Sequence, residues 1–324
     1  MARLAFLGSP EAAVTPLEAL VRAGHDVSLV VSRRDARRGR GAGTGPSPVK
    51  RAAQRLGIEV SDRVDDVVEA DVELAVVVAF GRLVPAWVLE AVPMLNMHFS
   101  LLPRWRGAAP VERAILAGDT ETGVSIIRLD EGLDTGPVLA AERVAIGPHE
   151  HAGELTARLA GTGVRLLLDV LRAGPDGLPD GEPQRGEPSY AAKLDPAELR
   201  LDWGRSAIQL ERVVRLDRAW TTFRGTRLRV LDARAQPGDR PGEPDDVGTI
   251  DGSAVRTGDG RLELHTVQPA GRRAMPAAQW LRGARPAPGE RLGGPEEAHG
   301  PAEPEAPHEP EAARKLGGPE KSAR

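Results

Sequence analysis

An asparagine and a histidine stand two residues apart at the end of an apolar segment. Residues 95–99 (Leu-Asn-Met-His-Phe) have the composition of a buried strand, in which side chains two residues apart point to the same side. Asn96 and His98 should therefore project together at the strand end where open α/β sheets bind ligands. An amide donor beside an imidazole suits the stabilisation of a developing oxyanion. The alternative is a histidine that ends a strand with an ordinary hydrogen bond.

A second segment, residues 130–137 (Asp-Glu-Gly-Leu-Asp-Thr-Gly-Pro), carries three carboxylates. Its two glycines and its proline predict a tight loop. Asp134 could stabilise the protonated form of His98, since a nearby anion favours the charged imidazole. Taken alone, an aspartate in such a loop is equally consistent with an ordinary turn residue.

Alternating strands and helices should position these groups. Residues 74–79 form a continuous apolar run, which is typical of a central parallel strand buried on both faces. Strands separated by helices predict a doubly wound, Rossmann-like α/β domain. The expected strands are 3–7, 27–31, 74–79, 95–99, 124–129 and 138–144, and the expected helices are 11–22, 48–56 and 154–171.

The first turn does not have the pattern of a dinucleotide site. Pro10 and Glu11 follow Gly8 where a Gly-x-Gly-x-x-Gly motif needs glycines beside a pyrophosphate, and the sequence has no Walker motif. We therefore expect no nucleotide cofactor.

The rest of the chain changes character after the last expected helix. Residues 174–188 are rich in glycine and proline and predict a linker, and several short β-rich runs follow between 199 and 283. Residues 286–324 contain only two large aliphatic residues beside eight prolines and eight glutamates, which predicts disorder. The expected units are an α/β domain with linker (1–188), a small OB-like β-barrel (189–285) and a disordered tail (286–324).

Composition excludes several classes of protein. The 324 residues include no cysteine, so disulfides, zinc fingers and thiol nucleophiles are excluded. The longest apolar run, 74–80, is far shorter than a bilayer requires, and the N-terminal apolar stretch is too short for a signal peptide. We expect a soluble cytoplasmic protein that binds neither a membrane nor DNA. A net charge of −4 leaves room for a local basic patch.

Two arginine-rich segments could form such a patch. Residues 32–47 hold five arginines and one aspartate among glycines, and residues 200–234 hold nine arginines against four acidic residues. Arginines in this arrangement suit phosphates and unpaired bases, so the segments predict contact with RNA. A solvated surface is the alternative for both.

Three motifs occur in order: Asn-x-His-x-Ser-Leu-Leu-Pro from Asn96, Arg-Gly-Ala-Ala-Pro from Arg106, and Asp-x-Gly-Leu-Asp-Thr-Gly from Asp130. Together they resemble the 10-formyltetrahydrofolate-dependent formyltransferases, and the resemblance runs from about residue 4 to residue 293. Within that family, the similarity is to members whose acceptor is initiator methionyl-tRNA. It implies direct formyl transfer to the α-amine of the methionine, through a tetrahedral intermediate, for translation initiation. No metal is implied.

The resemblance also implies roles for individual residues. The catalytic set would be Asn96, His98 and Asp134. Residues expected to border the folate co-substrate are Ser100, Leu101, Leu102, Pro103, Phe80, Asp130 and Gly132. Residues expected to bind tRNA are Arg38, Arg40, Arg215 and Arg224. The sequence departs from the family near Ala12 and around Trp220, which concerns the methionine pocket and tRNA docking.

Two alternatives remain open. A sugar-nucleotide N-formyltransferase would share the catalytic set but would not require the arginine-rich segments. A non-catalytic RNA-binding protein on the same fold would not require an intact set. His149 and His151 could suggest a metal, although two histidines after Pro148 are more typical of a surface loop.

Overall fold

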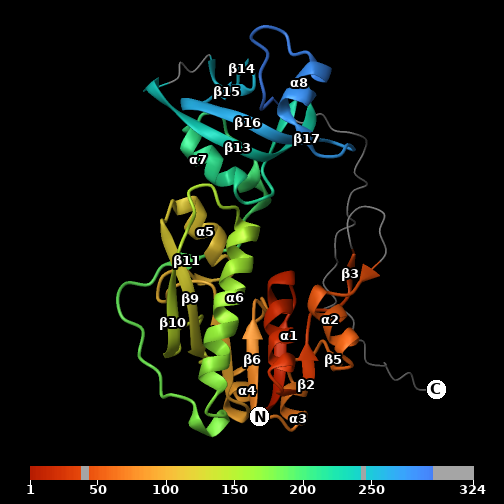
Figure 1. Ribbon diagram of the computed structural model, residues 1–324, viewed down its shortest axis with the longest axis vertical. Helices are drawn as coiled ribbons and strands as arrows, with labels where there is room; N and C mark the ends of the chain where they lie inside the picture. Colours follow the sequence, from red (N-terminus) through yellow and green to blue (C-terminus); the bar gives the residue numbers. More distant parts are fainter. Residues whose placement is uncertain (38–43, 242–245, 295–324) are drawn as a thin grey trace, which may run out of the picture.

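The computed structural model describes residues 1–37, 44–241 and 246–294. An α/β domain built on a parallel sheet is followed by a smaller antiparallel β domain, which lies beyond one end of the long helix α6 (Ala152–Leu171) (Figure 1). The predicted Rossmann-like α/β domain followed by a smaller β domain is therefore confirmed. Within the described residues, we find no helix that is long and apolar enough to cross a membrane.

The sheet of the first domain has seven strands in the order β10-β9-β7-β6-β1-β2-β5. The five strands from β5 to β7 run parallel, whereas β9 and β10 pair antiparallel at one edge. The strands are β1 (Arg3–Gly8), β2 (Asp26–Val31), β5 (Glu59–Ser61), β6 (Leu74–Val78), β7 (Met94–His98), β9 (Glu121–Arg128) and β10 (Val138–Ala145). Strand order reverses between β1 and β6, the position at which such sheets bind ligands.

Helices cover both faces of this sheet because the parallel strands are apolar on both faces. One core contains side chains of α1 (Val14–Arg22), α2 (Pro48–Leu56), α5 (Pro110–Ala117) and α6. The opposite core contains side chains of α3 (Asp66–Glu69) and α4 (Ala86–Ala91). At Gly163 in α6, a Cβ atom would lie 2.5 Å from the sulfur of Met97. This glycine therefore lets α6 pack closely against β7.

The second domain is an antiparallel sheet in the order β12-β13-β16-β15-β14, with β17 beside β16. Helices α7 (Ala207–Val214) and α8 (Ala277–Ala284) pack on its core, which includes Leu210 and Trp280. The strands are β12 (Trp220–Phe223), β13 (Thr226–Pro241), β14 (Ile250–Asp251), β15 (Ala254–Arg256), β16 (Asp259–Pro269) and β17 (Met275–Pro276). Between α6 and α7 the chain forms the short elements η2 (Pro175–Gly177), β11 (Tyr190–Ala191) and η3 (Pro196–Leu199).

Residues 286–294 correct the expectation that the disordered tail begins at 286. The Leu292 N–H donates to the Gly248 carbonyl and the Gly293 N–H donates to the Thr222 carbonyl, each at 2.9 Å. The segment thus lies between β14 and β12 and connects the two edges of the sheet. Leu292 is buried in the core of this domain, which offsets the entropy of ordering the segment. The remainder of the expected tail, 295–324, lies outside the described residues.

Candidate active site

Strand β7 places Asn96 and His98 on the sheet face that is turned away from α6. Their neighbours Leu95 and Met97 belong to the core beneath α6, so the alternation of a strand directs Asn96 and His98 to the other face. Both side chains are buried, with exposed fractions of 8% and 6%. A buried polar group is costly unless it is hydrogen-bonded, so the partners of these two side chains define the site.

Asp134 supplies the shared partner. Its Oδ1 accepts a hydrogen bond from Asn96 Nδ2 at 3.0 Å, and its Oδ2 accepts one from the Gly107 N–H at 2.8 Å. The His98 Nδ1 atom lies 3.6 Å from the same Oδ2. Asp134 has a φ of +53°, a conformation that costs energy for a residue other than glycine. The structure therefore brings Asn96, His98 and Asp134 together around one carboxylate.

The other ring nitrogen of His98 fixes its tautomer. Nε2 lies 2.7 Å from the Trp105 carbonyl oxygen, which can only accept, so Nε2 carries a hydrogen. Nδ1 is consequently the nitrogen that faces Asp134.

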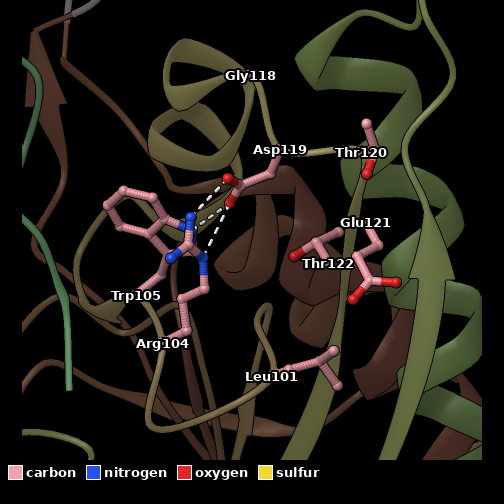
Figure 2. Close-up of a pocket in the computed structure, with 8 residues that line it drawn as sticks. All are labelled: Leu101, Arg104, Trp105, Gly118, Asp119, Thr120, Glu121 and Thr122. Atoms are coloured by element: carbon pink, nitrogen blue, oxygen red, sulfur yellow. Dashed lines mark hydrogen bonds and ion pairs between the residues drawn. The ribbon is translucent and has the colours of Figure 1, made fainter. Parts of the chain in front are cut away.

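Trp105 and Asp119 are site components that the sequence reasoning missed. Asp119 accepts hydrogen bonds from the Trp105 indole Nε1 at 2.8 Å and from Arg104 Nε at 3.1 Å (Figure 2). The Arg104 guanidinium also lies over the Trp105 ring, 4.8 Å from its centroid. Trp105 adjoins the Arg-Gly-Ala-Ala-Pro motif, but nothing in the sequence pattern pairs it with Asp119.

A cavity of about 640 Å³ opens in front of the three side chains. Phe80, Asp130 and Gly132 line it, together with apolar side chains such as Val84 and Leu129, and contact of the first three with the folate stays a prediction. Asp130 shapes the wall because its Oδ1 accepts hydrogen bonds from the Gly132 N–H at 3.1 Å and from Thr135 Oγ1 at 2.6 Å. A volume of this size is typical of pockets that hold a drug-sized ligand.

Ser100, Leu101, Leu102 and Pro103 do not line this cavity, and their expected contact with the folate stays a prediction. The chain turns after β7, where the buried Ser100 hydroxyl donates to the Arg104 carbonyl and the Leu102 N–H donates to Ser125 Oγ at 3.2 Å. Leu101 instead lines a separate cavity of about 410 Å³ beside Asp119 (Figure 2).

The expected tRNA-binding arginines have different surroundings. Arg215 is buried, and it donates to the carbonyls of Glu150 at 2.8 Å and Gly147 at 3.0 Å. It therefore joins the two domains, which corrects the expectation of a tRNA contact. Arg224 remains exposed and forms an ion pair with Glu290 at 2.6 Å. Arg38 and Arg40 lie outside the described residues.

His149 and His151 also join the domains. His149 Nδ1 lies 2.6 Å from Glu211, and His151 Nδ1 lies 2.8 Å from Asp217. The hydrogen bond to Asp217 raises the pKa of His151 above its ordinary value. Among residues 1–37, 44–241 and 246–294, no group of three or more potential ligands is placed to hold a metal ion.

Comparison with known proteins places this geometry in a family. The family model described as formyl transferase matches residues 2–171, and the model of the formyl transferase C-terminal domain matches residues 193–285. A methionyl-tRNA formyltransferase from Thermus thermophilus is 48% identical over 90% of this chain and 99% of its own length.

Two solved structures share the fold. HypX from Aquifex aeolicus, in complex with tetrahydrofolic acid, has a TM-score of 0.61 and 18% identity over 87% of this chain and 47% of its own. The N-formyltransferase from Helicobacter canadensis, in complex with folinic acid and dTDP-3-aminofucose, has a TM-score of 0.62 and 17% identity over 82% and 99%. With two family models in sequence order and a 48% identical relative of matching length, this chain belongs to the formyl transferase family.

Proposed function

We propose that the protein transfers the formyl group of 10-formyltetrahydrofolate to the α-amino group of initiator methionyl-tRNA. The observation that carries the proposal is the convergence of Asn96, His98 and Asp134 on the wall of one large cavity. The name and the matching length of the Thermus thermophilus relative support the same acceptor. Translation initiation takes place in the cytoplasm, so we propose that location as well.

The cavity suits a folate co-substrate. Apolar walls such as Phe80 and Leu129 can contact a planar ring system, and the loop around Asp130 and Gly132 offers polar atoms at its edge. When bound, the co-substrate would supply an activated formyl group. Transfer forms a bond between the methionine nitrogen and the formyl carbon and breaks the bond between that carbon and the folate nitrogen. One proton leaves the amine and one reaches the folate nitrogen.

Each polar side chain has a part in this chemistry. Asn96 Nδ2 carries a second N–H besides the one given to Asp134, and it can donate this N–H to the formyl oxygen as negative charge develops there. His98 Nδ1 can hold or pass on a proton, while the Trp105 carbonyl keeps the ring in place through Nε2. Asp134 keeps lone pairs free on both oxygens, through which it can orient a water molecule that takes the amine proton.

Contact with tRNA is proposed for the arginine-rich segments. Arg227 lies over the Trp220 ring at 3.7 Å, and Arg200 lies over the same ring at 5.5 Å, so these cations gather on one side of the second domain. Arg224, which lies close to Arg227 in sequence, adds a further exposed cation. Such a group suits phosphate binding. For Arg38 and Arg40, which lie outside the described residues, we propose tRNA contact from the sequence.

A transfer assay with two acceptors tests the proposed function. Labelled formyl from 10-formyltetrahydrofolate is offered to methionyl-tRNA and, in parallel, to an amino-sugar nucleotide. We expect rapid labelling of methionyl-tRNA and none of the sugar. Labelling of the sugar alone would favour the sugar-nucleotide formyltransferase, and labelling of neither, with tRNA binding intact, would favour an RNA-binding protein without catalysis.

A further inference from the structure

A glutamine from the segment between the domains contacts the loop that carries Asp134. Gln184 Nε2 donates hydrogen bonds to the main-chain carbonyls of Asp134 at 2.7 Å and Gly136 at 2.9 Å. These carbonyls flank the left-handed turn at Asp134, whose conformation persists only if its surroundings hold it. Gln184 is therefore bonded to the main chain of the residue whose side chain joins Asn96 and faces His98.

Arg106 fixes the orientation of this amide. Its Nε and Nη2 atoms donate to Gln184 Oε1 at 3.1 and 2.6 Å. A guanidinium has no acceptor, so the amide oxygen must face Arg106 and the amide nitrogen must face the two carbonyls. The next residue, Gly107, donates its N–H to the Asp134 carboxylate. Arg106, Gly107 and Gln184 thus hold Asp134 through both its main chain and its side chain.

Both ends of the segment around Gln184 are fixed. On one side, Glu182 and Val138 exchange two main-chain hydrogen bonds of 2.8 Å beside the start of β10. On the other side, the Arg106 N–H donates to the Ser189 carbonyl at 2.8 Å, and β11 pairs with β8 (Arg106–Gly107). We call residues 182–191 the strap. Between these two fixed points, Gln184 of the strap contacts the loop at residues 130–137.

We propose that Gln184 is a positioning residue for the transfer reaction, acting through Asp134 and oriented by Arg106. This inference rests on the proposed function, because the reaction is the one in which Asp134 would act. Gln184 lines no part of the cavity that the structure describes, so it should affect the rate of transfer and not the binding of either substrate.

Replacement by glutamate isolates the donated hydrogen bonds. Gln184→Glu keeps the size and the acceptor for Arg106, but it removes the donor and turns a charged oxygen toward two carbonyl oxygens. The loop should then shift away. A displacement of about 1 Å at a reacting group can cost about a hundredfold in rate, so we expect kcat to fall by ten- to a hundredfold. The KM values for methionyl-tRNA and 10-formyltetrahydrofolate should stay close to wild type.

The kinetic test uses matched variants. Gln184→Ala should behave like Gln184→Glu, and Glu187→Gln, an exposed site in the same strap, should behave like wild type. In an Asp134→Ala background, Gln184→Glu should have no further effect on the single-turnover rate, because Gln184 acts through the Asp134 carboxylate and that carboxylate is absent. A further loss of similar size in that background, or a wild-type kcat for Gln184→Glu, would overturn the proposal.

Amide hydrogen exchange gives a readout that does not depend on the acceptor. Amides of residues 130–137 should exchange faster in Gln184→Glu than in wild type and in Glu187→Gln, with the melting temperature little changed. Unchanged exchange in that loop would refute the positioning role, whatever the acceptor proves to be. If wild type formylates neither acceptor, the proposed function fails, and the contact between strap and loop is judged by exchange alone.

Discussion

Asn96 and Asp134 are 38 residues apart in sequence, yet the Asn96 amide donates to the Asp134 carboxylate at 3.0 Å inside the protein. This bond uses one N–H of the Asn96 amide and leaves the second N–H available to donate to a substrate. The same carboxylate lies 3.6 Å from His98, so a single anion orders both groups. An arrangement fixed in advance stabilises developing charge without reorganisation during the reaction, which is the main source of such catalysis.

Removal of the Asp119 carboxylate should slow the reaction from outside the main cavity. Asp119→Leu takes away the acceptor of the Trp105 indole, and the Trp105 carbonyl holds His98 in place. We expect kcat to fall by about tenfold with little change in KM, because a small displacement of a reacting group is costly. Glu121→Gln is the matched control, since Glu121 lines the same small cavity and has no bond to Trp105. Equal activity of the two variants would show that the indole contact is dispensable.

Two truncations should differ sharply in stability. A chain ending at Gly294 should melt as the full chain does, because the sequence beyond it has little to bury. A chain ending at Arg285 loses buried Leu292 and the Arg224–Glu290 ion pair. Burial of one leucine is worth about 1.5–3 kcal/mol, so the melting temperature should drop by about 5–10 °C. Calorimetry of both chains measures this, and equal melting temperatures would contradict the assigned role of residues 286–294.

The contact between His151 and Asp217 should make stability depend on pH. The pKa of His151 is raised, first by its hydrogen bond to Asp217, with Asp232 and Glu154 adding to the effect. The protonated histidine therefore stabilises the folded state fully below its ordinary pKa of 6.5, and this contribution is lost as pH rises through the raised value. The pKa of Asp217 is lowered, since its hydrogen bonds from His151 and Gly153 outweigh the opposing effect of burial.

Melting temperatures of wild type and His151→Gln test this directly. The advantage of wild type should be largest near pH 6 and should shrink toward pH 9. Asp217→Asn should remove most of the same pH dependence. Parallel curves for wild type and His151→Gln would mean that the pair does not couple protonation to folding.

Arg40, in the arginine-rich segment at residues 32–47, should matter for a tRNA acceptor and not for a small one. Arg40→Ala should weaken the use of methionyl-tRNA without affecting folate binding. Loss of one phosphate contact should also lower the salt dependence of tRNA binding by about one unit of slope. The measurement is formylation at two salt concentrations beside a folate titration. A wild-type result for this variant would contradict the proposed contact between this segment and tRNA.

Regular elements were predictable because their pattern is local. The apolar run at 74–79 corresponds to β6, which is buried along its whole length, and the helical spacing after 154 corresponds to most of α6. The meeting of Asn96 with Asp134 followed from the family motifs. Their catalytic role stays a prediction.

Partners supplied by distant segments were not predictable. Gln184 lies in a stretch rich in glycine and proline that reads as a linker, and only the fold sets it against Asp134. Leu292 looked like an isolated aliphatic residue because the gap between β12 and β14 that it fills is a tertiary feature. Arg215 looked like part of a basic surface, whereas burial against two carbonyls gives it a structural role. Composition does not report burial.

Single-turnover formyl transfer by His98→Ala and Asp134→Ala measures what these two side chains contribute to the reaction. The enzyme is saturated with 10-formyltetrahydrofolate and methionyl-tRNA, and tRNA binding is measured separately on the same preparations. Loss of a group that stabilises a developing oxyanion costs about 10²–10³ in rate, so both variants should fall by at least that much while binding tRNA as wild type does. A His98→Ala protein that keeps more than about a tenth of the wild-type rate would contradict the catalytic role assigned here.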